Sequence, residues 1–276
     1  MFLPHSVGVH YDIDTPSDVL VLSLSPKVGP RTRQALDQLD WDRSRVQQAL
    51  RLLASPQSRL LLAGRVNPWT MSHIGMISRC RLRVISEERG MRAMGRAERG
   101  EVHSLFGFLL QQLGAQAMVD YICSIADMAF IDTRVVFAHL GLQLTEGQRF
   151  NSDLGRVEQL PDQLMADFVR ACHAAPVPII LGGHSLVAGS MWALMDALLY
   201  LRGEEQLPAQ YQLVQIDRDH PWVGQPHHRL ILAGRVPGEL LAYRQAGLLN
   251  NHPRSDFLVS PGMKLYYRIP TSLSAH

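Results

Sequence analysis

The sequence predicts an α+β protein with a helix-rich central part and a C-terminal α/β part. Residues 43–175 carry apolar side chains mainly at helical spacing, whereas short apolar runs bounded by glycine and proline follow Pro176. The chain has 276 residues, 46% of them hydrophobic, which is enough for one large domain or two small ones. We therefore expect a strand and turn segment at 1–42, a helical domain at 43–175 and a small α/β domain at 176–276.

Residues 43–175 are expected to be helical. The apolar run 19–24 is the one strand expected before Pro176. Pro56, directly after Ser55, ends one helix and begins the next, because proline is tolerated only in the first turn. The helices predicted in this part are 43–54, 56–63, 78–88, 102–130, 133–140 and 161–174.

Strands and helices alternate in the C-terminal part. Gly182 and Gly183 separate an apolar strand at 177–181 from a helix at 185–201. Residues 211–216 alternate between apolar and polar side chains, as a half-buried strand does. Two further strands are expected, at 229–233 and 264–269.

Composition excludes several classes of protein. An ordinary apolar fraction and a formal net charge of +2 exclude a disordered chain. No run reaches the roughly 18–20 apolar residues that a membrane span needs, so we expect no membrane partner. Cys80, Cys123 and Cys172 lie far apart, which indicates neither a disulfide framework nor a zinc finger and favours the cytoplasm. No cofactor is expected.

Arginines concentrate between residues 78 and 99, where seven of them accompany only three glutamates. A helix at 78–88 that follows a shorter helix and a turn has the layout of a helix-turn-helix, whose second helix enters the major groove. The alternative is a solvated helix face on which Glu87 and Glu88 pair with the arginines. The candidate base and phosphate contacts are Arg79, Arg81, Arg83, Arg89, Arg92, Arg96 and Arg99.

Part of this region resembles the helix-turn-helix of the flagellar master activator's C subunit. The similarity lies in residues 49–53, in the Ser-Arg-Cys-Arg-Leu run at 78–82, in Glu-Glu-Arg-Gly at 87–90 and in Val-His-Ser-Leu-Phe at 102–106. The resemblance implies DNA binding and transcription regulation in a bacterial cell. It covers about 60 of the 276 residues.

A second pattern suggests an enzyme. Gly182-Gly183 places His184 and Ser185 at the carboxyl end of a strand, where α/β active sites form, and makes them candidate catalytic residues. Asp217, Asp219 and His220 end another strand, and with His184 they are candidate metal ligands. The two segments resemble the Gly-Gly-Asp-His-Ser and Asp-x-His-x-Asp motifs of the ureohydrolase (arginase-like) family, without the first aspartate. That resemblance implies a metal-dependent hydrolase.

Binding is the function that these patterns favour. We expect a regulator that contacts nucleic acid through its arginine-rich segment, or a structural subunit of a multiprotein complex that meets a protein partner or a second copy of the chain. The metal-dependent hydrolase is the alternative.

Overall fold

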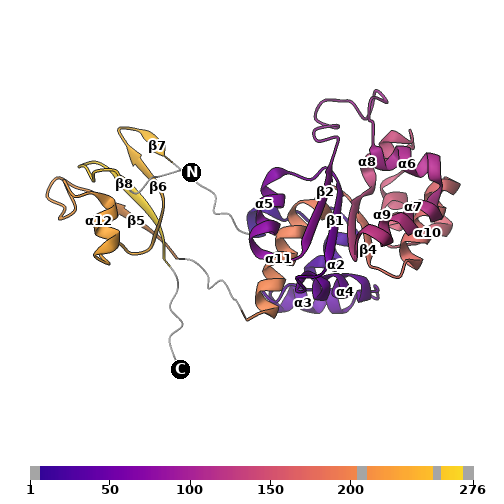
Figure 1. Cartoon of the computed structure of the whole chain (residues 1–276), viewed down its shortest axis with the longest axis horizontal. Coiled ribbons are helices and arrows are strands. Elements are labelled where there is room, and N and C mark those ends of the chain that lie inside the picture. Colours follow the sequence, from indigo (N-terminus) through magenta and orange to yellow (C-terminus); the bar gives the residue numbers. More distant parts are fainter. Residues whose placement is uncertain (1–6, 204–209, 251–255, 270–276) are drawn as a thin grey trace. The chain divides into compact units, whose positions relative to one another are not determined.

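The chain forms two compact units in the computed structural model, which describes residues 7–203, 210–250 and 256–269 (Figure 1). The units are Met1–Glu204 and Glu205–His276. The predicted boundary between residues 175 and 176 is wrong, because β4 (Ile179–Gly182) pairs with β3 (Met128–Asp132) in the sheet of the first unit. The boundary predicted between residues 42 and 43 also falls inside that unit. The fold class, α+β, is confirmed.

The first unit is built on a four-stranded parallel sheet of order β2-β1-β3-β4. β1 (Arg59–Gly64) and β3 occupy the two central positions, while β2 (Arg81–Ser86) and β4 form the edges. Because all four strands run in one direction, the chain leaves each of them at the same edge of the sheet. Ligands of open parallel sheets bind at this carboxyl edge.

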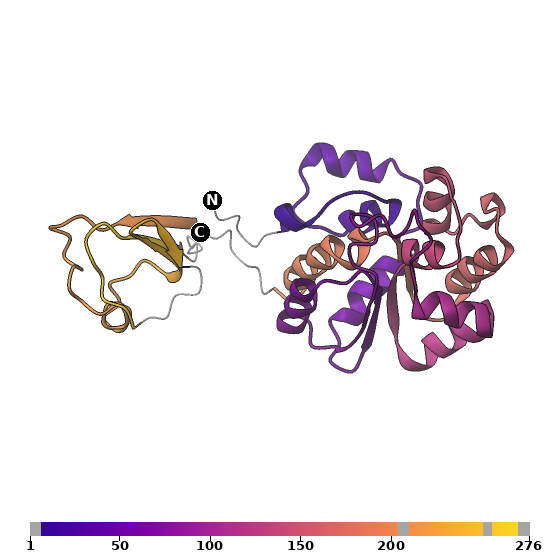
Figure 2. The same ribbon diagram turned by 90° about the horizontal axis from the view of Figure 1, so that it is seen from above.

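Helices cover both faces of the parallel sheet (Figures 1 and 2). Alternate residues of β1 contribute to the two cores: Leu60 and Leu62 to one, Leu61 and Ala63 to the other. The first core is completed by α2 (Pro16–Leu22), α4 (Ser44–Leu53), α5 (Pro68–Ile77) and α11 (Gly189–Leu201). The second is completed by α6 (Leu105–Leu113), α7 (Ala115–Ile125) and α10 (Gln163–Ala174). α8 (Thr133–His139) also contributes to the second core, and η2 (Ser185–Val187) to the first. The remaining elements are α1 (Val7–His10), α3 (Pro30–Asp37), α9 (Glu146–Asp153) and η1 (Val157–Gln159).

Two segments predicted as helices are strands. The segment 56–63 was expected to be helical, but β1 is buried on both faces, which suits its continuous run of leucines to a central parallel strand. The helix expected at 78–88 is β2, in which arginines at 81 and 83 alternate with Leu82 and Val84. Leu82 and Val84 pack on the first core, so the period of two decides the structure of this segment.

Three further predictions of local structure are corrected. The run 19–24 lies largely in α2, because Pro16 begins the helix and the Asp18 carboxylate accepts the Thr15 backbone N–H at 2.9 Å. The helix expected over 102–130 is interrupted at Gly114, whose φ is +76°, and its last residues belong to β3. The strand expected at 229–233 lies in α12 (His227–Leu232). The other predicted helices and strands are confirmed, within a few residues at their ends.

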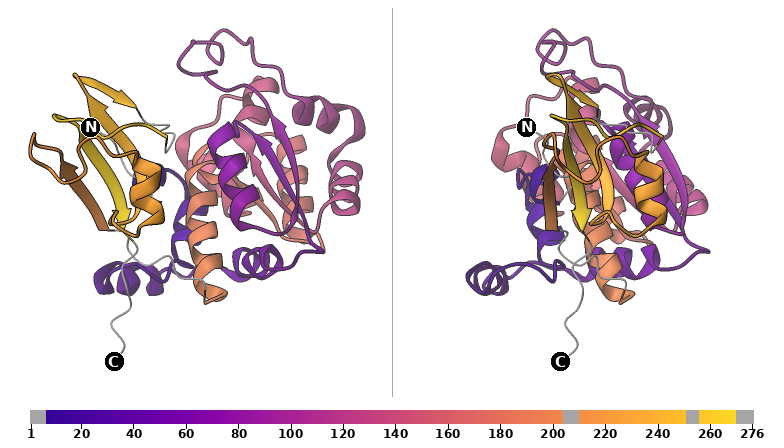
Figure 3. Two further views of the ribbon diagram at one scale, coloured as in Figure 1. Left: turned by 60° about the vertical axis from the view of Figure 1, so that its left-hand side comes forward. Right: turned by 90° about the vertical axis from the view of Figure 1, so that its left-hand side faces the viewer.

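The second unit is a four-stranded antiparallel sheet of order β5-β8-β6-β7 with α12 beside it (Figure 3). Its strands are β5 (Gln210–Gln215), β6 (Glu239–Gln245), β7 (Leu248–Asn250) and β8 (Lys264–Ile269). Ile216, Leu230 and Tyr267 are buried in its core, where a His227 ring nitrogen and the Tyr267 hydroxyl lie 2.7 Å apart. In neither unit is any described helix long and apolar enough to cross a membrane.

Candidate functional site: the carboxyl edge of the parallel sheet

The carboxyl ends of the two central strands meet at an ion pair. Arg65 follows β1 and donates from Nε to Oδ2 of Asp132, the last residue of β3, at 2.6 Å, and from Nη2 to Oδ1 at 3.1 Å. The Asp132 carboxylate is fully buried. Gly64 makes this approach possible, because its φ is +117° and a Cβ atom there would lie 2.4 Å from that of Asp132. The pair therefore fixes how β1 and β3 end.

A second, deeper ion pair lies at the start of α8. Arg134 donates from Nη1 and Nη2 to the two carboxylate oxygens of Asp153, at 2.7 and 2.6 Å, and both side chains are buried. Thr133 accepts from Arg134 at 2.9 Å and donates to the Gly182 carbonyl of β4 at 3.1 Å. Burial raises the pKa of Asp153 to about 6, and the charge of Arg134 opposes that shift.

Ser185 follows β4 and is bound to a buried carboxylate. Its hydroxyl donates to Oδ2 of Asp18 at 2.6 Å, while Ser190 donates to Oδ1 at 2.7 Å. Thr15 donates to Oδ2 of the same carboxylate at 2.8 Å. The described part of the chain holds no hydrogen bond between Ser185 and the His184 ring, so the structure uses Ser185 to anchor the loop after β4 to α2.

His184 lies at the same edge of the sheet, beside the Arg65–Asp132 pair. Partial desolvation of its ring, followed by the charge of Arg65, lowers the pKa of His184, although solvent still reaches the side chain. A neutral imidazole there can accept a hydrogen bond from a ligand. Of the two predicted catalytic residues, His184 is therefore the accessible one.

The three arginines predicted to contact bases lie on and before edge strand β2 rather than on a recognition helix. Arg79, Arg81 and Arg83 are all exposed. Arg83 donates from Nε to the Ile125 carbonyl at the end of α7, at 3.2 Å. Arg81 and Arg83 project to the same side of β2, because successive side chains of a strand alternate.

The other four arginines belong to the loop between β2 and α6, residues 87–104, at the carboxyl edge of the sheet. Arg96 pairs with Glu88 and Arg99 with Glu101, each at 2.8 Å. Arg89 and Arg92 are exposed and form no ion pair with any residue that the structure describes. The predicted alternative, a solvated helix face, is not formed, because residues 81–86 are a strand and a loop follows it. Within that loop Glu88 pairs with Arg96.

A cavity of about 150 Å³ lies beneath this loop, against α8. Its charged lining residues are three arginines and one glutamate. Arg92 and Glu98 come from the loop, Arg134 from α8 and Arg149 from α9. Met91 and Phe137 are among the apolar residues of its wall.

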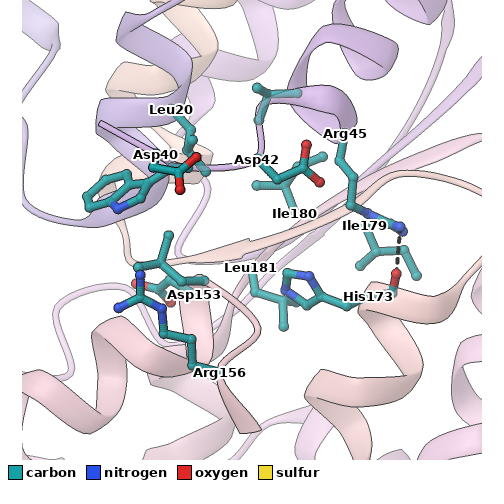
Figure 4. A pocket seen from close by; sticks show the side chains of 13 residues that line it. Leu20, Asp40, Asp42, Arg45, Asp153, Arg156, His173, Ile179, Ile180 and Leu181 are labelled. Carbon is teal, nitrogen blue, oxygen red and sulfur yellow. Dashed lines mark hydrogen bonds between the residues drawn. The ribbon is translucent and has the colours of Figure 1, made fainter. Parts of the chain in front are cut away.

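A larger cavity, of about 280 Å³, runs along edge strand β4 (Figure 4). Figure 4 shows Asp40 and Asp42 on one side of it and Arg156 and His173 on the other. Arg45 closes one end and donates to the His173 carbonyl at 2.7 Å. Because acidic and basic groups are balanced here, the lining does not indicate the charge of a ligand.

The four predicted metal ligands are divided between the two units. His184 belongs to the first unit, and Asp217, Asp219 and His220 belong to the second. The ring of His220 accepts the Trp222 backbone N–H at 3.2 Å and stacks edge-on against the indole. Residues 7–203, 210–250 and 256–269 contain no group of three or more His, Cys, Asp or Glu side chains that could hold a metal ion. A four-ligand site stays a prediction.

Sequence reasoning missed the ion-paired residues of this edge and the arginine of α9. The missed residues are Arg65, Asp132, Arg134, Arg149 and Asp153. A signal for the first two was present, because a short apolar run ending in a charged residue is typical of a buried strand that reaches a site.

Comparison of the chain with protein-family models and with curated proteins gives no match to either. The carboxyl edge of the sheet therefore has to be interpreted from its own residues.

Proposed function

We propose that the protein binds the phosphate backbone of a nucleic acid through the exposed arginines of residues 79–92. The observation that carries this proposal is the position of Arg81 and Arg83, which project side by side from an edge strand and leave most of their guanidinium N–H groups to solvent. Arginine binds phosphate oxygens through pairs of parallel N–H groups, which makes such a row suited to a polyanion.

The spacing of the row supports a repeating ligand. Residues two apart in a strand are about 6.5 Å apart, and the sheet holds that spacing rigidly. Arg79 precedes the row, and Arg89 and Arg92 follow it in the loop, all of them exposed. Contacts of this kind go to the backbone rather than to base edges, so we expect binding with little sequence preference.

Arg96 and Arg99 are expected to contribute least. Each already forms an ion pair, with Glu88 and Glu101 respectively. A phosphate would have to replace a carboxylate at these two positions, whereas it meets uncompensated charge at Arg89 and Arg92.

Fluorescence anisotropy with labelled random duplex and single-stranded DNA tests the proposal. We expect affinity to fall steeply between low and physiological salt, because phosphate contacts release counterions. The double substitution Arg81→Ala with Arg83→Ala should weaken binding at every DNA sequence and reduce the salt slope by about two units, one for each arginine.

The matched control is Arg31→Ala with Arg51→Ala. These arginines are exposed on α3 and α4, so this variant changes the net charge equally without touching β2. Equal loss of DNA binding in both double variants would show that net charge, rather than the position of Arg81 and Arg83, determines the affinity. Absence of DNA binding at low salt would exclude the proposal.

A further inference from the structure

The cavity beneath the 87–104 loop is lined by three arginines, of which one, Arg134, forms an ion pair with a residue that the structure describes. Arg149 is half-buried and has neither an ion pair nor a side-chain hydrogen bond among the described residues. Burial, and then the charges of Arg134 and Arg92, lower the pKa of Arg149, while the charges of Glu146 and Asp153 oppose that shift. The three guanidinium groups are thus close enough to repel one another, and only Arg134 is paired, with Asp153.

The loop that roofs the cavity is held in place by its own contacts. Met91 and Val102 are buried with Val135 of α8 in a small apolar cluster. Backbone hydrogen bonds close the loop on itself, including those from the N–H groups of Arg96 and Ala97 to the Met91 carbonyl. The cavity is therefore present before any ligand binds, which reduces the entropy lost on binding.

Glu98 is the one acidic side chain of the lining and does not neutralise the arginines. It is exposed, and the described structure contains no ion pair between it and Arg92, Arg134 or Arg149. A partly desolvated cation without a partner is unfavourable, and an anion that binds to it offsets this cost.

We infer that this cavity is a binding site for a tetrahedral oxyanion of the phosphate class, held by Arg149 and Arg92. A doubly charged phosphate neutralises both unpaired arginines, whereas a carboxylate neutralises one. The cavity volume of about 150 Å³ accommodates a phosphate group together with a small part of the molecule that carries it. The same chemistry is offered by inorganic phosphate and by a phosphate monoester such as a nucleoside monophosphate.

Isothermal titration calorimetry of the full-length chain tests the site, with inorganic phosphate as the probe and chloride adjusted to constant ionic strength. We expect saturable binding of phosphate. Added sulfate should compete with phosphate for the site, and added chloride should not. Arg149→Gln should weaken phosphate binding at least about tenfold, the effect of losing a charge-assisted hydrogen bond. Glu98→Gln should tighten it by about threefold, since a nearby like charge is removed.

A matched control is Arg51→Gln on α4, which should leave phosphate binding unchanged. Glu98→Gln also distinguishes loss of the site from misfolding, because it should increase the affinity for phosphate, whereas misfolding would decrease it. Equal affinities in the wild type and Arg149→Gln, or no heat of binding at millimolar phosphate, would overturn the inference. A nucleoside monophosphate that binds more tightly than phosphate identifies an ester as the ligand, and equal affinity identifies the free oxyanion.

Arg92 belongs to both proposed sites, so the two properties are separated by variants at other positions. The Arg81 and Arg83 double variant should retain phosphate binding in this cavity, and Arg149→Gln should retain binding to DNA. Failure of one property therefore leaves the other measurable.

Discussion

At the scale of single residues, the buried carboxyl group of Asp153 links the stability of the protein to pH. Its pKa, about 6, lies above the value of 3.8 typical of an exposed aspartate, because burial outweighs the charge of Arg134. A carboxyl group with a higher pKa in the folded state binds more protons when folded than when unfolded. The stability that it contributes is therefore largest below about pH 4 and declines as the pH rises through 6.

We expect Asp153→Asn to remove this pH dependence. The free energy of unfolding of the wild type minus that of the variant should fall by up to about 3 kcal/mol between pH 4 and pH 6.5, and then stay level. Urea denaturation across this pH range measures the difference. Ser152→Ala, which alters a buried neighbour that does not titrate, should differ from the wild type by an amount independent of pH. A difference for Asp153→Asn that rises with pH would contradict the assignment.

At the scale of elements, the loop between β2 and α6 depends on Glu87. The Glu87 carboxylate accepts the Ser104 hydroxyl at 2.5 Å and the Leu105 backbone N–H at 2.8 Å. Ser104 in turn caps α6 by accepting the Gly107 N–H at 3.0 Å. One carboxylate therefore joins the end of β2 to the first turn of the next helix.

Glu87→Ala should destabilise the protein by about 1–2 kcal/mol, because it leaves the cap and the helix terminus without their acceptor. Limited trypsin digestion should cut within the arginine-rich loop faster than in the wild type. Glu101→Ala, which removes only an exposed ion pair with Arg99, should leave the free energy of unfolding close to that of the wild type, because water and salt screen such a pair. Equal digestion rates for Glu87→Ala and the wild type would show that the loop does not depend on this anchor.

The same elements show what sequence patterns can predict here. α4 was predicted correctly from its apolar periodicity, and α8 and α10 from Asp132 and Asp162, which cap their first turns. β1 was not, because a short apolar run fits a buried helix as well as a buried strand. The first residues of β3 were predicted as the end of the helix at 102–130.

The candidate site was predicted only in part for the same reason. His184 and Ser185 were correctly placed after a strand, since two glycines mark its end. The partners of the missed ion pairs are 67 residues apart for Arg65 and Asp132 and 19 apart for Arg134 and Asp153. Which of these charges meet depends on strand order and helix placement, and neither is determined by local periodicity.

At the scale of the whole molecule, the two units have separate cores. The large clusters on the two faces of the parallel sheet lie within residues 1–204, and the cluster around Tyr267 lies beyond them. Among the described residues, each buried cluster is made of residues of one unit, as expected of independently folding parts.

A chain ending at Glu204 should therefore fold alone. We expect a cooperative thermal transition by circular dichroism within about 3 °C of that of the first unit in the full chain. Phosphate binding should be retained in this fragment, because all the residues proposed for that cavity lie in the first unit. A broad, non-cooperative melt would show that the second unit is needed for folding of the first.

The arginines of β2 also affect how one copy of the protein meets another. An edge strand offers unpaired backbone groups onto which a strand of a second copy can add, and such addition leads to aggregation. Two β2 edges paired in parallel would bring Arg81 and Arg83 of one copy beside those of the other, and the resulting electrostatic repulsion disfavours extension of the sheet between molecules. A bound polyanion cancels that repulsion, and self-association would then be coupled to occupancy of the edge.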